Sequence, residues 1–336
     1  MSRKNNPNHS LGPLVVTGAA GFVGANLVRA FHEKGYRVIG IDGPTSRHWR
    51  LRGLSSVPLA RVDLTSKDEV AKFIHDTRPS VVINCAAYGG YSMQTAIDRT
   101  YRVNFEGVRN LLESVCGLAQ LQAFIQAGTS SEYGFECAAP REGSSTIPDS
   151  HYAVSKVAAT ALVQYYARKH GVPACCLRLY SVYGPYEEFS RLIPRLLLAA
   201  KAGRLPPLVN PKVSRDFVYV DDVVRAFETV VRKRSRLGKG EIYNIGTGTA
   251  TTLQKLVATS RRIFRVEESP KWGSMENRHW DHPRWYSNPA KARKELGWRA
   301  TTGLEAGLRA TMRWMDAHPE AILDGQRHSV IHDMEP

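Results

Sequence analysis

The chain has 336 residues, of which 43% are hydrophobic and 23% are charged, and this ordinary globular composition excludes a disordered protein, a collagen-like repeat and a disulfide miniprotein. The length predicts one large or two medium domains. A net charge of +15 leaves nucleic acid, an anionic membrane surface and an anionic small molecule open as partners. The densest basic run, 232–239, follows a predicted helix and contains no aromatic residue, so we expect a solvated helix end.

The sequence contains no run of 18 apolar residues, so it predicts no transmembrane helix. Residues 1–10 lack the apolar segment of a signal peptide. The five cysteines are odd in number, and Cys85 and Cys175 lie in apolar runs that are typical of strands. These features favour reduced thiols in a cytoplasmic protein that is not bound to a membrane. No spacing of Cys and His indicates a metal site.

The first two thirds of the chain alternate short apolar runs with helical patterns, which predicts a Rossmann-type α/β fold, a doubly wound parallel sheet with helices on both faces. The strand runs are continuously apolar rather than alternating, as expected for strands that are buried on both faces. We predict strands over 14–17, 36–42, 80–87, 123–129 and 174–180, and helices over 22–33, 67–76, 103–116 and 152–170.

The pattern changes after Pro185, where a second and smaller lobe is expected from discontinuous pieces. We predict a helix over 191–202, a strand over 217–220, a helix over 222–231, a strand over 242–245 and amphipathic helices from 252. The expected division is a cofactor-binding domain of 12–184 and 215–245, a discontinuous C-terminal substrate-binding lobe of 185–214 and 246–320, and flexible tails of 1–11 and 321–336.

A glycine-rich loop directly follows the first predicted strand and opens the first predicted helix. Glycines allow a tight turn and a close approach to a pyrophosphate, and the helix N-terminus supplies free N–H groups and partial positive charge. The predicted cofactor contacts in this loop are Gly18, Gly21, Phe22, Val23 and Gly24.

Asp42 ends the second predicted strand, where an acidic residue is expected to bind a ribose. A carboxylate at this position favours the free 2′-hydroxyl of NAD and repels the 2′-phosphate of NADP. Alternatively, Asp42 only forms a turn with Gly43 and Pro44, and the nearby Arg47 and Arg50 keep NADP open.

The glycine spacing differs from the usual Gly-x-Gly-x-x-Gly, and the sequence resembles the extended short-chain dehydrogenase/reductase family over about residues 13–317. Further matches belong to the NAD-dependent nucleotide-sugar epimerase/dehydratase branch of that family: Val62-Asp63-Leu64, Asn84-Cys85-Ala86-Ala87, Tyr152-x-x-x-Lys156, and the segments 178–185, 215–222 and 243–248. The resemblance implies NAD as cofactor, with further cofactor contacts from Asp63, Leu64, Ala86, Ala87, Tyr152 and Lys156.

Tyr152 and Lys156 are four residues apart on a predicted helix, so they share one face. A tyrosine has a pKa of about 10, and a neighbouring ammonium group lowers this pKa toward the range of a general base. The resemblance adds a hydrogen bond from Lys156 to the nicotinamide ribose and one from Thr129 to the reacting sugar oxygen. The alternatives are a chance Tyr–Lys spacing and a plain threonine at the end of a strand.

Sugar 4,6-dehydratases of this family place Asp-Glu directly after that threonine, whereas this chain has Ser130 and Ser131. Glu132 stands one position later, and a shift of one residue points a side chain elsewhere. The sequence therefore argues against a dehydratase, unless a bulge in the loop returns Glu132 to the site.

The diphosphate of a nucleotide sugar needs guanidinium partners, for which bidentate arginine suits the geometry. The resemblance assigns this role to Arg215 and Arg278, with Arg191 as a further candidate, and it places Asn210 near the base; a plain surface arginine is the alternative for Arg278. We expect Tyr88, Ser130, Ser131 and Ser181 to line the sugar pocket, beside the glycine pair at 89–90.

These features predict an NAD-dependent nucleotide-sugar 4-epimerase that transiently oxidises C4 of a nucleotide-diphosphate hexose. A 4-ketoreductase that consumes NAD(P)H is the close alternative, followed by a 4,6-dehydratase and a non-catalytic NAD-binding scaffold. The resemblance also implies a homodimer formed through the predicted helices 103–116 and 152–170. We expect no metal, nucleic acid or membrane partner.

Overall fold

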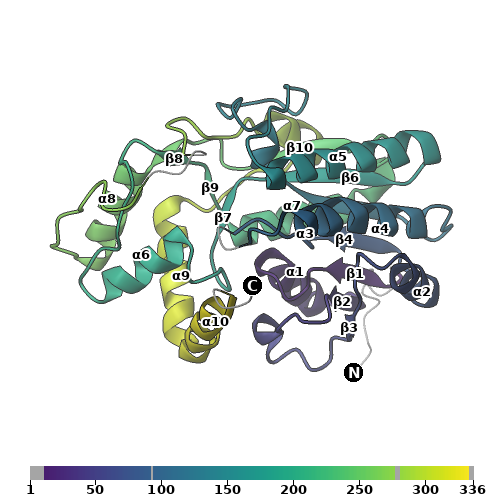
Figure 1. Ribbon diagram of the computed structural model, residues 1–336, viewed down its shortest axis with the longest axis horizontal. Coiled ribbons are helices and arrows are strands. Elements are labelled where there is room, and N and C mark those ends of the chain that lie inside the picture. Colours follow the sequence, from purple (N-terminus) through teal and green to yellow (C-terminus); the bar gives the residue numbers. More distant parts are fainter. Residues whose placement is uncertain (1–10, 92–93, 277–280, 333–336) are drawn as a thin grey trace.

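The structure, a computed structural model, describes residues 11–91, 94–276 and 281–332. A seven-stranded parallel sheet forms the larger part of the molecule, with strand order β10, β6, β5, β4, β1, β2, β3 (Figure 1). The strands are β1 (Leu14–Thr17), β2 (Val38–Asp42), β3 (Leu59–Arg61), β4 (Val81–Asn84), β5 (Ala123–Thr129), β6 (Ala174–Leu179) and β10 (Glu241–Ile245).

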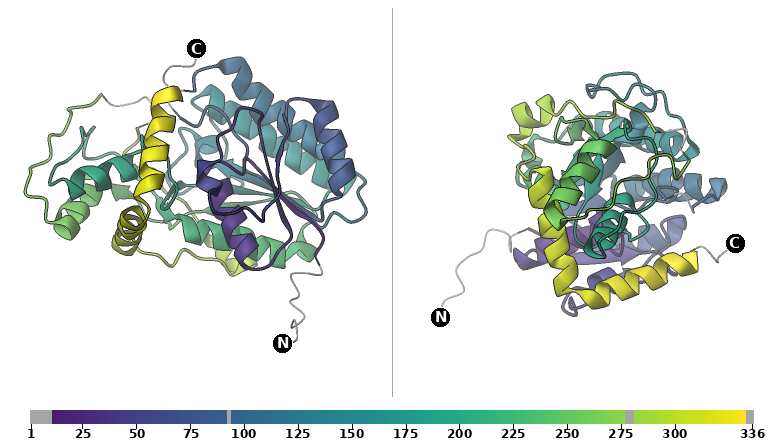
Figure 2. Two further views of the ribbon diagram at one scale, coloured as in Figure 1. Left: turned by 90° about the horizontal axis from the view of Figure 1, so that it is seen from below. Right: turned by 90° about the vertical axis from the view of Figure 1, so that its left-hand side faces the viewer.

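Helices cover both faces of this sheet, which confirms the predicted doubly wound α/β fold (Figure 2). The residues of β1 point alternately to the two faces, so Leu14 packs with α1 (Phe22–Glu33) and α7 (Val220–Arg232), while Val15 packs on the other face. That other face is covered by α2 (Lys67–Thr77), α4 (Gly107–Val115) and α5 (His151–His170). Burial of both faces explains the continuously apolar strands.

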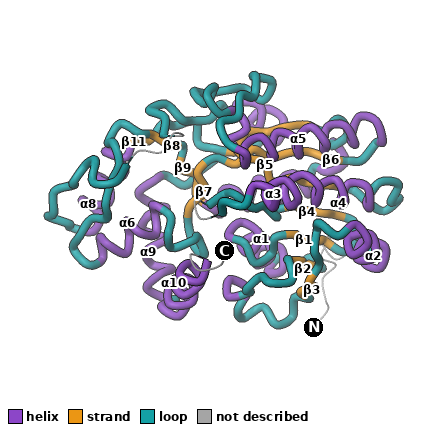
Figure 3. Tube along the Cα trace, in the orientation of Figure 1, coloured by secondary structure: helices purple, strands orange, loops and turns teal. Residues whose placement is uncertain are grey.

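A second core lies beside the sheet, at the left of Figure 1, between α6 (Leu192–Lys201), α8 (Leu253–Phe264) and α9 (Leu304–Ala317). Two short strand pairs connect this region to the sheet domain: β7 (Ser181–Tyr183) with β9 (Phe217–Tyr219), and β8 (Ser214–Arg215) with β11 (Thr251–Thr252). Loops make up much of this part of the chain (Figure 3).

The sequence did not predict strand β3 at the edge of the sheet, and two further parts of the chain differ from the sequence-based expectation. The helix predicted over 103–116 begins earlier, with α3 (Ile97–Tyr101), and passes through a wider helical turn, Arg102–Glu106, into α4. At the C-terminus, α10 (Pro319–His332) stands where a tail was expected. It packs closely because Gly325 has no side chain: a Cβ there would lie 2.3 Å from a ring carbon of Phe189.

All five cysteines are free, and Cys175 and Cys176 are buried in β6. In the described ranges, no helix combines the length and the apolar character that crossing a membrane requires.

Asp216, which is fully buried, joins segments that are far apart in the sequence. Its carboxylate accepts hydrogen bonds from the backbone N–H of Thr247 (2.8 Å), Gly248 (3.0 Å) and Ser287 (3.0 Å), and from the hydroxyls of Thr247 (2.5 Å) and Ser287 (2.6 Å). The loop after β10 and the segment around Ser287 are thereby held against the start of β9. A buried carboxylate requires this complete set of donors, because an unpartnered charge in the interior is strongly unfavourable.

We predict that Asp216→Asn lowers the free energy of unfolding by about 3 kcal/mol, because the amide turns one acceptor into a donor that faces other donors. Urea denaturation measures this loss. The matched control is the exposed Asp221→Asn in the first turn of α7, which should change stability by less than about 1 kcal/mol. Equal losses in the two variants would contradict the role of Asp216.

Candidate active site

The predicted cofactor residues lie together at the carboxyl edge of the sheet. Gly18 to Gly24 follow β1, Asp42 ends β2, Asp63 and Leu64 follow β3, and Ala86 and Ala87 follow β4. The chain runs from β1 outward through β2 and β3, then returns to β4 on the other side of β1. Ligands of doubly wound folds bind where the strand order reverses in this way.

The glycine-rich loop has the close packing that excludes side chains. Gly18 has φ +61°, and a Cβ on it would lie 2.7 Å from the backbone nitrogen of Ala86, while a Cβ on Gly24 would lie 2.1 Å from the carbonyl oxygen of Gly18. The first turn of α1 has no side-chain cap, so its N–H groups are available to an anion. This cradle fits the pyrophosphate of a dinucleotide.

Asp42 contacts this loop directly, since one of its carboxylate oxygens accepts a hydrogen bond from the backbone N–H of Ala20 at 2.7 Å. The second oxygen accepts from the hydroxyl of Ser46 at 2.5 Å. Arg50 is buried and engaged elsewhere, with the carboxylate of Glu188 at 3.0 Å and the carbonyl oxygen of Tyr186 at 2.7 Å. A carboxylate therefore lies beside the glycine-rich loop, while Arg50 is engaged by other partners.

Tyr152 stands at the first turn of α5, beside the end of β5, where Thr129 hydrogen-bonds to it. Gly90 lies beside the ring, and a Cβ on it would lie at an ordinary contact distance, 3.8 Å, from the Tyr152 hydroxyl. Burial raises the pKa of Tyr152 to about 12, while Thr129 and the charge of Arg191 oppose this rise.

The prediction that Lys156 lowers the pKa of Tyr152 is wrong for the protein without a bound cofactor. The Nζ atom of Lys156, which is buried, donates to the carbonyl oxygen of Ala127 at 2.7 Å and makes no hydrogen bond to Tyr152. Burial lowers the pKa of Lys156, and the carboxylate of Glu132 opposes this effect most strongly. The spacing of four residues puts both side chains on one face of α5, but at different depths.

Glu132 is fully buried and does not return to the cavity. Its carboxylate accepts from the guanidinium of Arg178 (2.8 Å), the hydroxyl of Thr160 (2.9 Å) and the backbone N–H of Thr129 (2.9 Å). The last bond, with one from the Ser131 N–H to the Thr129 hydroxyl, closes a capping box around the short helix that follows β5. Glu132 therefore positions Thr129 from the side that faces away from the cavity.

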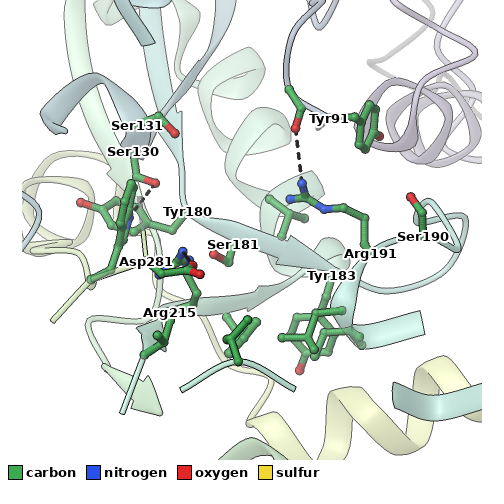
Figure 4. Close-up of a pocket in the computed structure, with 18 of the residues that line it drawn as sticks. Tyr91, Ser130, Ser131, Tyr180, Ser181, Tyr183, Ser190, Arg191, Arg215 and Asp281 are labelled. Carbon is green, nitrogen blue, oxygen red and sulfur yellow. Dashed lines mark hydrogen bonds and ion pairs between the residues drawn. The ribbon is translucent and has the colours of Figure 1, made fainter. Parts of the chain in front are cut away.

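A cavity of about 600 Å³ opens between the sheet domain and the second core (Figure 4). Thr129, Ser130, Ser131, Tyr152, Ser181, Arg191 and Arg215 all line it, as expected. Arg191 donates to the carbonyl oxygen of Gly90 at 3.3 Å, on the side of Tyr152. Arg215 lies toward the other side, where it forms an ion pair with Asp281 at 2.7 Å (Figure 4).

Two predicted substrate contacts, Tyr88 and Asn210, lie elsewhere. The ring of Tyr88 packs against the guanidinium of Arg99 at 4.8 Å and does not line the cavity. Asn210 also lies outside the lining, where its side-chain oxygen accepts from the N–H of Lys212 at 2.8 Å in an exposed turn. Arg278 falls outside the described residues.

Sequence reasoning missed Trp285, Asp281 and Glu187, all of which line the cavity. The indole N–H of Trp285 donates to the Ser130 hydroxyl at 3.1 Å, and its ring lies 4.9 Å from the guanidinium of Arg215. Only the tryptophan-rich composition of this segment indicated a role, because the hydrogen bonds of Trp285 to Ser130, after β5, and to Ser214 of β8 depend on tertiary structure. Within the described ranges, no group of three His, Cys, Asp or Glu residues is arranged to hold a metal ion.

Comparison with known proteins places this geometry in context. The model of the NAD dependent epimerase/dehydratase family matches residues 14–246. The chain is 29% identical to a trifunctional UDP-glucose 4,6-dehydratase/UDP-4-keto-6-deoxy-D-glucose 3,5-epimerase/UDP-4-keto-L-rhamnose-reductase of Arabidopsis thaliana, over 91% of this chain and 48% of that protein. This chain therefore spans about half the length of that relative.

Two solved structures share the fold over nearly their whole length. A UDP-glucuronic acid 4-epimerase of Bacillus cereus, in complex with UDP-glucuronic acid and NAD, matches with a TM-score of 0.81 and 26% identity, over 91% of this chain and 99% of that one. A UDP-glucose 4-epimerase of Thermotoga maritima, with UDP-glucose, matches with a TM-score of 0.82 and 25% identity, over 91% and 99% of the two chains.

We predict that Glu132→Ala lowers the free energy of unfolding by about 3–5 kcal/mol, because it leaves the buried guanidinium of Arg178 without its counter-charge. The exposed Glu136→Ala, four residues on, is the matched control and should cost less than about 0.5 kcal/mol. Thermal and urea unfolding of the two variants test this, and similar stabilities would show that the buried ion pair does not hold the loop.

Proposed function

This chain belongs to the NAD-dependent epimerase/dehydratase family, and from that membership we propose that it is a nucleotide-sugar 4-epimerase. The observation that carries the proposal is the shared cavity: Tyr152, Thr129 and Arg215 all line it, and Glu132 is turned away from it. A proton-transfer group and a diphosphate partner thus face one ligand, while the acid that a 4,6-dehydratase needs is engaged by Arg178.

The residues around the glycine-rich loop would hold NAD. The N–H groups of Phe22, Val23 and Gly24 would bind the pyrophosphate, and Asp42 would bind the hydroxyls of the adenosine ribose. Lys156 would hydrogen-bond the nicotinamide ribose. When bound, NAD supplies a hydride acceptor and donor and a positive charge that favours the phenolate form of Tyr152.

The chain's own groups would manage the proton on the C4 oxygen of the sugar. Tyr152 would take this proton as C4 is oxidised to the ketone and give it back as C4 is reduced from the opposite face. Thr129 hydrogen-bonds Tyr152, so it would keep the phenol oxygen and the sugar oxygen aligned. Every atom and electron is returned within one cycle, so no cofactor is consumed.

In the same cavity, Arg215 would bind the diphosphate. One terminal nitrogen of its guanidinium donates to Asp281 at 2.7 Å and the other donates to the carbonyl oxygen of Ser214 at 2.8 Å, while the ring of Trp285 lies against the group, so the guanidinium is held in place at the cavity wall. Because the two neighbouring 4-epimerase structures hold UDP sugars, we propose a UDP-hexose as substrate.

A 4-ketoreductase is the second candidate, and one observation favours it. With its pKa raised to about 12, Tyr152 holds its proton at neutral pH, which is the form that protonates a 4-keto sugar during reduction. Such an enzyme would release its cofactor after every cycle.

We also propose a homodimer in the cytoplasm. Val154 and Tyr165 expose 40% and 53% of their surfaces on α5, and burial of these apolar groups in a second copy would stabilise a pair. The free cysteines are consistent with a reducing compartment.

Our test of the epimerase begins with the cofactor content of the purified protein, where about one NAD per chain is expected. This protein should interconvert UDP-glucose and UDP-galactose without added cofactor. Tyr152→Phe should keep its NAD and lose at least about 100-fold in kcat. Near-normal turnover in this variant would overturn the proposed mechanism, whereas an empty protein that oxidises NADH or NADPH with a 4-keto sugar would identify the ketoreductase.

Removal of the ribose-binding carboxylate should change the choice of cofactor. We predict that Asp42→Ala weakens NAD binding by about tenfold and leaves NADP binding unchanged or stronger, because a charged hydrogen bond to the 2′-hydroxyl is lost together with the repulsion of a 2′-phosphate. Titration of protein stripped of cofactor with both dinucleotides measures this ratio. An unchanged ratio would remove Asp42 from the ribose.

A further inference from the structure

Tyr186 lies in a strained turn, residues 184–188, between β7 and the residues that line the cavity. Its φ of +69° is in the left-handed region that favours glycine, and a tyrosine adopts this conformation at a cost in free energy. The turn leads directly to Ser190 and Arg191, both of which line the cavity. Because a strained backbone persists only where its surroundings hold it, the contacts of this turn must keep it in place.

The buried guanidinium of Arg50 makes several of these contacts. Its Nε atom donates to the carbonyl oxygen of Tyr186 at 2.7 Å, and its Nη2 atom donates to the carboxylate of Glu188 at 3.0 Å. Its Nη1 atom donates to the carbonyl oxygen of Ala20 at 3.3 Å, within the glycine-rich loop. One side chain therefore bridges the glycine-rich loop and the turn.

Asn26 joins the same two parts of the chain. It lies on α1, the helix that the glycine-rich loop opens, and its side-chain amide donates to the carbonyl oxygen of Pro185 at 3.0 Å. Asn26 exposes only 8% of its surface, so water would not readily replace this hydrogen bond. A displacement of the turn would therefore break bonds to both the loop and the helix.

The contacts of Arg50 also reach the wall of the cavity. Tyr91 lines the cavity, and its ring lies 5.6 Å from the guanidinium of Arg191 (Figure 4). Burial raises the pKa of Tyr91, and the charges of Arg50 and Arg191 oppose this rise. Arg50 thus lies between the predicted cofactor loop and the cavity, close to both.

The conformations of the two segments depend on each other through Arg50. A guanidinium in the interior needs its partners, because a buried charge that loses them is strongly unfavourable. Displacement of the turn would remove the Tyr186 carbonyl and the Glu188 carboxylate, and displacement of the glycine-rich loop would remove the Ala20 carbonyl. The strain at Tyr186 favours displacement of the turn, whereas a ligand that fixes the glycine-rich loop opposes it.

We propose that Arg50 is a positioning residue that couples the binding of NAD to the binding of the nucleotide sugar. NAD at the glycine-rich loop holds Arg50 in place, Arg50 holds the turn at Tyr186, and the turn sets the position of Arg191 in the cavity. Coupling between two binding sites is reciprocal, so the nucleotide sugar also retains NAD. The inference rests on the proposed function, because it takes NAD and a nucleotide sugar as the two ligands.

The rate at which the holoprotein loses NAD tests this coupling. The Tyr152→Phe protein, which does not turn over, is diluted with and without saturating UDP-glucose, at a temperature at which NAD leaves within hours. An alcohol dehydrogenase assay reports the free NAD. We expect UDP-glucose to slow the loss of NAD by at least about tenfold. Adding Arg50→Met should reduce this slowing to less than about threefold, because the link between the two sites is removed.

Arg52→Met is the matched control, since Arg52 is exposed and pairs with Asp324 of α10 at 2.7 Å. It should leave the slowing unchanged. Arg50→Lys is a second variant that keeps a cation beside Glu188, so it should fold even where Arg50→Met does not. One ammonium group does not replace the fork of donors that reaches both Ala20 and Tyr186, and the slowing should fall here as well.

An unchanged slowing in the Arg50 variants would overturn the proposal, as would an equal fall in Arg52→Met. Faster NAD loss by the same factor with and without UDP-glucose would show that Arg50 only supports the fold, since the ratio would not move. Direct contact between the sugar and the nicotinamide persists in every variant, so it does not imitate the expected result.

Failure of the proposed function has a different signature. The native protein would then not epimerise C4, whereas the slowing of cofactor loss and its dependence on Arg50 would persist. If calorimetry shows that UDP-glucose does not bind, the nucleotide assignment fails, and dTDP-glucose carries the same comparison.

Discussion

The close approach of two backbone segments at the carboxyl edge of the sheet is the constraint on which the rest of the site depends. A Cβ on Gly18 would lie 2.7 Å from the nitrogen of Ala86, so the loops after β1 and β4 meet at the point where the strand order reverses. This contact brings the start of α1 to the crevice and aims its N–H groups into it. The same edge of the sheet carries Thr129 at the end of β5, and Tyr152 lies beside it in the first turn of α5.

A buried ion pair next to the cavity determines which side chains the loop after β5 presents to it. Glu132 is fully buried and shared by Arg178, Thr160 and the backbone of Thr129. The unfavourable free energy of removing two charges from water is offset only when every polar atom has a partner. The pair therefore holds the Thr129 loop in the one conformation that supplies these partners. The same carboxylate opposes the lowering of the Lys156 pKa by burial and leaves the cavity side of the loop to two serines.

The second core completes the site from the opposite side. Arg215 and Asp281 come from β8 and from the segment before Trp285, and the indole N–H of Trp285 reaches back to Ser130 on the loop after β5. Arg215 and the loop after β5 are thus connected through one aromatic side chain. Asp216, whose carboxylate holds the loop after β10 and the segment around Ser287, keeps these pieces in place.

The sequence by itself determined most strands of the sheet, the glycine-rich loop and the shared helix face of Tyr152 and Lys156, because these depend on local signals: apolar runs, glycine spacing and helical periodicity. Thr129 was indicated only by the resemblance to the family. Strand β5 and helix α1 have the predicted bounds. Only the tertiary structure decided that Lys156 bonds Ala127 rather than Tyr152, that Glu132 faces Arg178, and that Glu187 and Trp285 line the cavity. Side-chain depth, ion pairing and contacts between distant segments arise from packing, and spacing along the chain does not encode them.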